Sequence, residues 1–101
     1  MKNITEYRYI IVELFDGTRE NSRHKIRARP LPNQWASPAV RVEFPSGFRI
    51  RQNIEQLYKI RAKFKNTKLA PQLFTYRDWE PILINVEEAR LFIEAKQWWI
   101  C

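Results

Sequence analysis

The sequence predicts an α+β protein that is mainly β: a small curled antiparallel sheet of five or six strands with one C-terminal helix. Within residues 57–65, apolar and basic side chains alternate without a break from Tyr58 onward, and turn residues separate further short apolar runs. Asn85 followed by Val86-Glu87-Glu88 and then by apolar residues at helical spacing indicates the helix. A chain of 101 residues is long enough for a single domain, residues 1–101, with one core.

Residues 57–65 are central to this prediction. As a strand they place four basic side chains on one face, and Tyr58, Ile60, Ala62 and Phe64 on the other. A helix over residues 54–65 is the alternative, because Asn53-Ile54-Glu55-Gln56 has the form of a capping box. That helix would place Arg61 and Lys65 within its apolar stripe, so we expect a strand.

Two strands are expected before this one. Residues 7–15 are rich in β-branched and aromatic side chains and end at the turn signal Asp16-Gly17. One face of this strand, with Ile10, Val12 and Leu14, is expected in the core, and the other, with Tyr7, Tyr9 and Ile11, is expected to be half covered. Residues 24–29 alternate again, with Ile26 and Ala28 on the apolar face.

The middle of the chain predicts a loop and a hairpin. Residues 30–38 contain three prolines and indicate an irregular loop, in which Trp35 either packs on the core or is exposed for binding. Residues 39–44 and 48–51 predict two paired strands joined at Pro45-Ser46-Gly47.

The last third predicts a short strand at residues 72–76, a buried strand at residues 82–84 and a helix from Val86 to about Gln97. Val86, Ala89 and Ile93 share the expected buried face of the helix. This order of elements suits an OB-like barrel whose helix plugs one end or covers one face.

The net charge of +7 is concentrated in the middle of the chain. Residues 23–68 carry twelve basic and two acidic side chains, whereas the segments on either side are slightly acidic. This asymmetry predicts an anionic partner, either nucleic acid or an acidic protein surface, although a solvated basic face would look the same.

The sequence contains no pattern that predicts catalysis, a cofactor or a metal site. His24 is the only histidine, two glycines cannot form a phosphate-binding loop, and the single cysteine, Cys101, excludes an internal disulfide. Glu94-Ala95-Lys96 has the form of a nuclease metal motif, but it lies in the expected helix, where its two charged side chains diverge. We therefore expect a binding module.

Single-stranded nucleic acid is the first binding partner that the sequence predicts, because basic side chains neutralise phosphates and aromatic side chains stack on unpaired bases. The predicted binding residues are the outward basic side chains and four aromatic ones: Lys25, Arg27, Arg29, Arg41, Arg49, Arg51, Lys59, Arg61, Lys63, Lys65, Tyr9, Trp35, Tyr76 and Trp79.

A protein-interaction or self-assembly module is the second function that the sequence allows. The apolar tail must dock on the body or meet another subunit, and the first strand is apolar on both faces. A homodimer through these elements is the predicted assembly, with Trp98, Trp99 and Ile100 at its interface.

The stretch Leu57-Tyr58-Lys59-Ile60-Arg61-Ala62-Lys63-Phe64, followed by Leu73-Phe74-Thr75-Tyr76 and Trp79, resembles small proteins encoded on bacterial mobile (integron-type) gene cassettes. The resemblance covers about a quarter of the chain. It implies a bacterial cytoplasmic protein and assigns no site residues. No segment has the length of a membrane span and residues 1–6 lack a signal-like apolar stretch, so a cytoplasmic location without a membrane partner is expected.

Overall fold

The computed structural model describes residues 7–18, 25–66, 70–75, 79–96 and 98, and among these it confirms a mainly β fold with one C-terminal helix. Two short 3-10 helices, Ser46–Phe48 and Arg51–Asn53, lie between the third and fourth strands. The other elements are β1 (Arg8–Asp16), β2 (Ile26–Pro30), β3 (Arg41–Val42), β4 (Leu57–Asn66), β5 (Pro71–Thr75), β6 (Ile82–Ile84) and α1 (Val86–Ala95).

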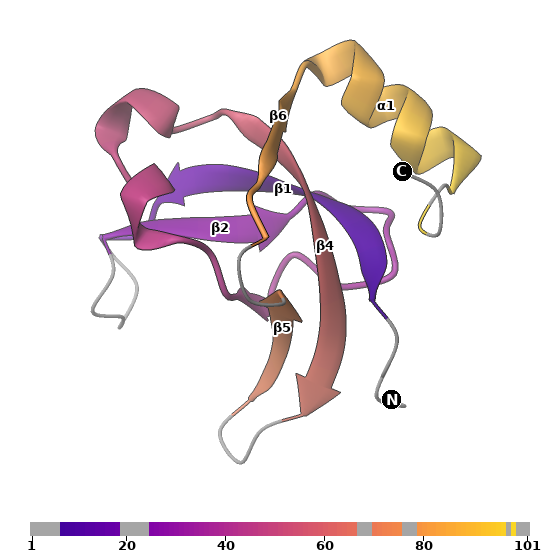
Figure 1. Ribbon diagram of the computed structural model, residues 1–101, viewed down its shortest axis with the longest axis horizontal. Coiled ribbons are helices and arrows are strands. Elements are labelled where there is room, and N and C mark those ends of the chain that lie inside the picture. Colours follow the sequence, from indigo (N-terminus) through magenta and orange to yellow (C-terminus); the bar gives the residue numbers. More distant parts are fainter. Residues whose placement is uncertain (1–6, 19–24, 67–69, 76–78, 97, 99–101) are drawn as a thin grey trace.

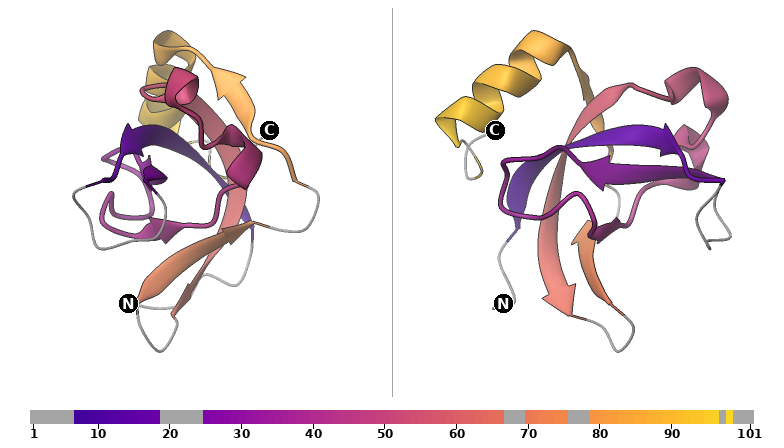
Figure 2. Two further views of the ribbon diagram at one scale, coloured as in Figure 1. Left: turned by 90° about the vertical axis from the view of Figure 1, so that its left-hand side faces the viewer. Right: turned by 180° about the vertical axis from the view of Figure 1, so that it is seen from behind.

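The strands form one curled sheet in the order β2-β1-β4-β5-β3, and β6 pairs with the first residues of β4. All of these strand pairs are antiparallel except β3 with β5, which is parallel. The expectation of a wholly antiparallel sheet is therefore wrong for this pair. β2 and β3 stand at opposite ends of this order yet contact each other, so the sheet nearly closes into a barrel (Figures 1 and 2).

The interior of the barrel is built on β4, the strand that the alternation of residues 57–65 predicts. Tyr58, Ile60, Ala62 and Phe64 are all buried, and they pack with the inner face of β1, formed by Ile10, Val12 and Leu14. The register places Ile10 opposite Ile60 at the centre of this core. The strand prediction for residues 57–65 is therefore confirmed, and the helical alternative is excluded.

A second core lies on the outer face of the barrel, beneath α1. Tyr9, Ile11 and Leu57 form its floor, and Ala89 and Phe92 of α1 cover them. Tyr9 and Ile11 are fully buried rather than half covered as expected. The middle of β1, residues 9–12, is thus buried on both faces, because the barrel core lies on one side and the second core on the other.

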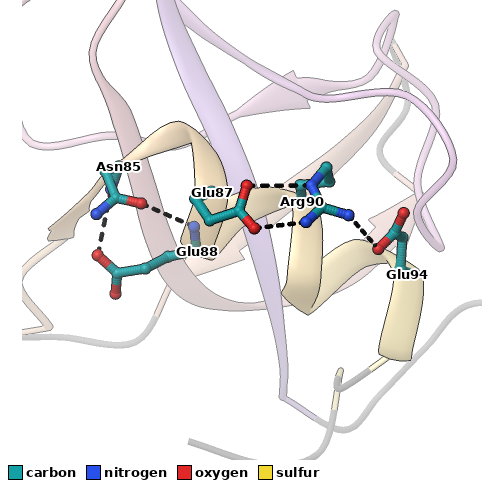
Figure 3. Close-up of polar contacts among 5 residues, drawn as sticks. All are labelled: Asn85, Glu87, Glu88, Arg90 and Glu94. Atoms are coloured by element: carbon teal, nitrogen blue, oxygen red, sulfur yellow. Dashed lines mark hydrogen bonds and ion pairs between the residues drawn. The ribbon is translucent and has the colours of Figure 1, made fainter.

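The start of α1 is as the sequence predicts, but its first apolar residue is not buried. The Asn85 side chain accepts a hydrogen bond from the Glu88 N–H at 2.8 Å, and the Glu88 carboxylate accepts from the Asn85 N–H at 3.4 Å (Figure 3). On the outer side of the helix, Arg90 bridges Glu87 and Glu94. Val86, expected in the core, is exposed because α1 contacts the sheet through Ala89 and Phe92.

The hairpin predicted around Pro45-Ser46-Gly47 is wrong. Only Arg41–Val42 forms a strand, β3, and the chain then turns through a 3-10 helix in place of a return strand. The reason is aromatic packing: the Phe48 ring lies 5.9 Å from that of Phe44 and 5.7 Å from that of Tyr58, between ring centroids. The segment after β3 therefore packs on the barrel core instead of pairing with β3.

The strand predicted at residues 82–84 exists as β6, but it is not buried as expected. Ile82 is 45% exposed and Leu83 is 60% exposed. Among the described strands, β6 pairs only with β4 and has just three residues, so little of the molecule covers it.

Burial of Tyr58 predicts a loss of stability at alkaline pH. Removal of the phenol from water raises its pKa above the ordinary value. Because the folded pKa is the higher one, the protonated phenol contributes its full stability below about pH 10, and that contribution is lost as the pH rises through the folded pKa. We expect Tyr58→Phe to flatten the alkaline fall in the free energy of unfolding, measured by urea titration from about pH 8 to about pH 11.

The matched control for that experiment is Tyr7→Phe, which removes a half-buried phenol just before β1. This variant should keep the alkaline fall. Identical pH profiles for Tyr58→Phe and the unchanged protein would show that burial of the Tyr58 phenol does not cause the fall.

Candidate nucleic-acid interface

A cleft of about 380 Å³ lies where β2 approaches the segment leading into β3. We call it the arginine cleft, because three arginines and no acidic residue line it. Its lining residues are Phe15, Arg27, Ala28, Arg29, Pro38, Ala39, Val40 and Arg41.

Strand alternation explains why the three arginines meet at this cleft. Ala28 of β2 and Val42 of β3 are buried in the barrel core, so Arg27, Arg29 and Arg41 extend from the outer face. Closure of the sheet then brings the outer face of β2 next to that of β3. The sequence predicted that each arginine points outward. The contact between β2 and β3, where the sheet closes, brings the three arginines together.

Arg29 is held in one position by two contacts. Its guanidinium donates to the Glu13 carboxylate at 3.2 and 3.3 Å, and it lies over the Phe15 ring, 4.3 Å from the centroid. The ion pair neutralises part of its charge, and the ring restricts its orientation. Arg29 therefore forms a fixed wall of the cleft.

Arg27 and Arg41 make the cleft electrostatically positive. Partial burial lowers the pKa of Arg27, and the nearby charge of Arg41 lowers it further. The stem of Arg27 also packs closely on Gly17, where an added Cβ would lie 2.8 Å from the arginine Cδ. The Arg41 side chain is exposed and makes no hydrogen bond or ion pair with the described residues. An anion entering the cleft would relieve the repulsion between these two charges.

Arg49 was predicted to point away from the core, together with the other strand arginines, and this prediction is wrong. Its guanidinium donates to the backbone carbonyl of Phe44 at 3.3 Å and to that of Ile26 at 3.0 Å. Partial burial lowers the Arg49 pKa, and the charge of Arg27 lowers it further. Arg49 thus fastens the segment after β3 to the start of β2 and adds positive potential behind the cleft.

A row of outward side chains continues from the cleft across the sheet. Arg41 of β3 pairs with Gln72 of β5, and Gln72 pairs with Lys65 of β4, so the three residues lie side by side on the outer face. In the neighbouring pair, Lys63 lies opposite Phe74. We call Arg41, Gln72 and Lys65 the outer row. The arginine cleft, the outer row, Lys63 and Phe74 together form the basic face.

Further basic side chains of β4 lie over aromatic rings. The Lys59 ammonium is 5.6 Å from the Tyr9 ring centroid and 5.4 Å from that of Phe92, and Lys63 is 5.2 Å from that of Tyr7. Arg61 lies 5.8 Å from the Tyr9 centroid. The stems of these side chains cover aromatic surface while their charges stay on the outer face of β4.

The other predicted basic residues lie outside the basic face. Lys25 is exposed just before β2, and Arg51 is exposed in the second 3-10 helix.

The predicted stacking residues are mostly engaged within the molecule, and this corrects the sequence-based set. Tyr9 is buried under α1 and lies edge-on to Trp79, with 6.2 Å between ring centroids. Trp35 packs on the barrel core and its Nε1–H donates to the Tyr9 carbonyl at 2.9 Å, so the packing alternative holds for this tryptophan. Trp79 contacts both cores. Tyr76 lies outside the described residues.

Two aromatics that were not predicted as binding residues, Phe15 and Phe74, lie on the outer face of the sheet. Both are half-buried side chains of the outer face, and neither belongs to either core. Each directly follows a buried leucine, Leu14 or Leu73, in a strand. Strand alternation would therefore have predicted from the sequence that both side chains lie on the outer face.

The tail residue Trp98 packs within the molecule. Its ring lies 5.4 Å from that of Phe92 between centroids, and its carbonyl accepts a hydrogen bond from the Tyr9 N–H at 2.6 Å. Trp98 is thus part of the second core, and Trp99 and Ile100 lie outside the described residues. The apolar outer face of β1, predicted to meet another subunit, is already covered by α1.

Comparisons of the chain with protein-family models, with curated proteins and with solved structures give no match. The resemblance to gene-cassette proteins accordingly stays a prediction. In the part of the chain that the structure describes, no helix is long and apolar enough to cross a membrane. The same residues contain no cluster of three or more histidine, cysteine or acidic side chains suited to a metal ion.

Proposed function

We propose that this protein binds single-stranded nucleic acid on the basic face. The observation that carries the proposal is the strand register, which lines up Arg41, Gln72 and Lys65 and joins them to the arginine cleft. Arg41 and Lys65 are two strands apart, which corresponds to roughly 10 Å between their backbones. Positive charges at such intervals can follow the phosphates of one extended strand.

Two features favour a single strand over a duplex. Phe74 is half-buried on the same face as the charges, where an unpaired base can stack on an aromatic ring. The exposed side of α1 carries Glu87 and Glu94, with Arg90 bonded between them. An acidic helix face is unsuited to the major groove of DNA, because the phosphates on either side repel it.

Binding of a fluorescently labelled thymidine oligonucleotide of about twelve nucleotides, followed by anisotropy, tests the proposal. We expect binding at about 50 mM salt that weakens steeply by about 200 mM. Phe74→Ala should reduce the affinity by about 5- to 150-fold, because one stacked base is worth about 1–3 kcal/mol. Leu91→Ala, an exposed apolar truncation on α1, should leave affinity unchanged.

The absence of any anisotropy change at low salt would reject the proposal. If Phe74→Ala and Leu91→Ala changed the oligonucleotide affinity equally, the binding surface would not include Phe74 of β5.

Protein interaction or self-assembly is the second candidate, and one observation favours it. Large apolar side chains are exposed at the β6 edge of the sheet. They are Ile82 and Leu83 on β6, and Val86 and Leu91 on α1. No described strand pairs with the outer edge of β6, which could add a strand from a second copy to make a homodimer. An acidic protein surface could instead occupy the basic face. Association through the apolar residues would be nearly insensitive to salt, unlike nucleic-acid binding.

A further inference from the structure

The arginine cleft differs from the rest of the basic face in how its charge is arranged. The outer row presents one cation per strand on an open surface, with Gln72 between them. The cleft gathers three arginines around about 380 Å³ without an acidic lining residue. A site of this kind favours a compact ligand of high negative charge over a stretch of evenly spaced single charges.

The lining of the cleft indicates what such a ligand carries beside its charge. Pro38, Ala39 and Val40 supply an apolar part of its lining. The volume is at the small end of the range for ligand pockets, enough for a phosphate with its sugar rather than for several nucleotides.

The charge of the phosphate decides which part of a strand fits best. A phosphodiester within a strand carries one negative charge, whereas a phosphomonoester carries about 1.5 to 2 near neutral pH and offers three terminal oxygens. Guanidinium groups bind such oxygens in pairs through parallel N–H donors. Arg41 can supply this fork, because its guanidinium makes no hydrogen bond with the described residues.

We propose that the arginine cleft binds the terminal phosphate of a single strand, with Arg41 as the principal ligand and Arg27 and Arg29 completing the site. This inference rests on the proposed function and adds a preference for a phosphorylated end. The outer row then holds the diester phosphates that follow along the strand.

Three oligonucleotides of one sequence test the inference: one with a 5′-phosphate, one with a 3′-phosphate and one with hydroxyl groups at both ends. We expect one of the phosphorylated strands to bind at least about tenfold more tightly than the hydroxyl strand. Inorganic phosphate at millimolar concentration should remove the tenfold advantage of the phosphorylated strand and leave the affinity for the hydroxyl strand unchanged. This result would show that the cleft prefers the phosphate at a strand terminus over free phosphate.

Arg41→Gln should abolish the tenfold ratio, and Arg41→Lys, which keeps the charge but loses the fork, should reduce it. Lys65→Gln is the matched control: it removes an exposed charge from the outer row, weakens all three strands alike and keeps the ratio. Urea titrations of each variant verify that the fold is retained.

Equal affinities for the three strands would overturn this inference and leave the proposed function standing. A ratio that survives Arg41→Gln would overturn the assignment to the cleft. The absence of binding by all three strands, and by inorganic phosphate alone in calorimetry, would overturn both proposals.

Discussion

Replacing Ile60 with alanine is expected to lower the free energy of unfolding by about 2–5 kcal/mol. Ile60 is completely buried at the centre of β4, and Ile10 of β1 lies opposite it in the register. The substitution removes buried methyl groups and leaves a cavity, since the close-packed core residues around Ile60 cannot collapse into the space. A small domain is stable by only about 5–15 kcal/mol, so the loss is a large fraction of the total.

Ile82→Ala is the matched control, because it deletes the same atoms from a strand residue that is 45% exposed. We expect it to cost less than about 1 kcal/mol. Urea titrations followed by tryptophan fluorescence measure both variants. Similar losses at the two positions would contradict the assignment of Ile60 to the core and of β6 to an exposed edge.

The fold could be predicted from the sequence wherever a local pattern determines the structure. The alternation of residues 57–65 identified β4 and its buried face, because each side chain's direction depends only on its place along the strand. Asn85 and Glu88 identified the start of α1 for a similar reason, since both partners of the capping box lie within one turn.

Local patterns failed where distant contacts decide the conformation. Pro45-Ser46-Gly47 has the composition of a hairpin turn, but Phe48 packs on Phe44 and Tyr58, and β3 pairs with β5, about thirty residues further along the chain. Likewise, the apolar composition of residues 82–84 predicted a buried strand. It did not indicate that β6 would pair with β4 along one edge and leave Ile82 and Leu83 exposed.

The candidate site was predictable in its residue types and not in its arrangement. Arg27, Arg29 and Arg41 were all among the predicted binding residues, but they are neighbours only because the sheet closes at the seam between β2 and β3. The aromatic residues were predicted less well. Tyr9 has the amphipathic character of a binding residue, and only the packing of α1 across β1 shows that it is buried.

Neutralising three charges of the basic face should have the largest effect on binding. We expect the combined variant Arg41→Gln, Lys63→Gln and Lys65→Gln to weaken single-strand binding by about 100-fold at low salt, if each charge contributes about 1 kcal/mol. The salt dependence should change as well. Each phosphate contact to a single strand contributes about 0.7 to the slope of log affinity against log salt, so losing three contacts should reduce that slope by about 2.

The control has to separate the basic face from the overall charge of the protein. The variant Arg51→Gln, Arg90→Gln and Lys96→Gln also removes three positive charges, which takes the net charge from +7 to +4 in both proteins. All three control side chains are exposed and lie outside the basic face. If non-specific attraction explained binding, the two variants would lose affinity equally. If the register of β3, β5 and β4 organises the binding surface, the slope should fall by about 2 only in the first variant, because only there do phosphates lose their direct partners.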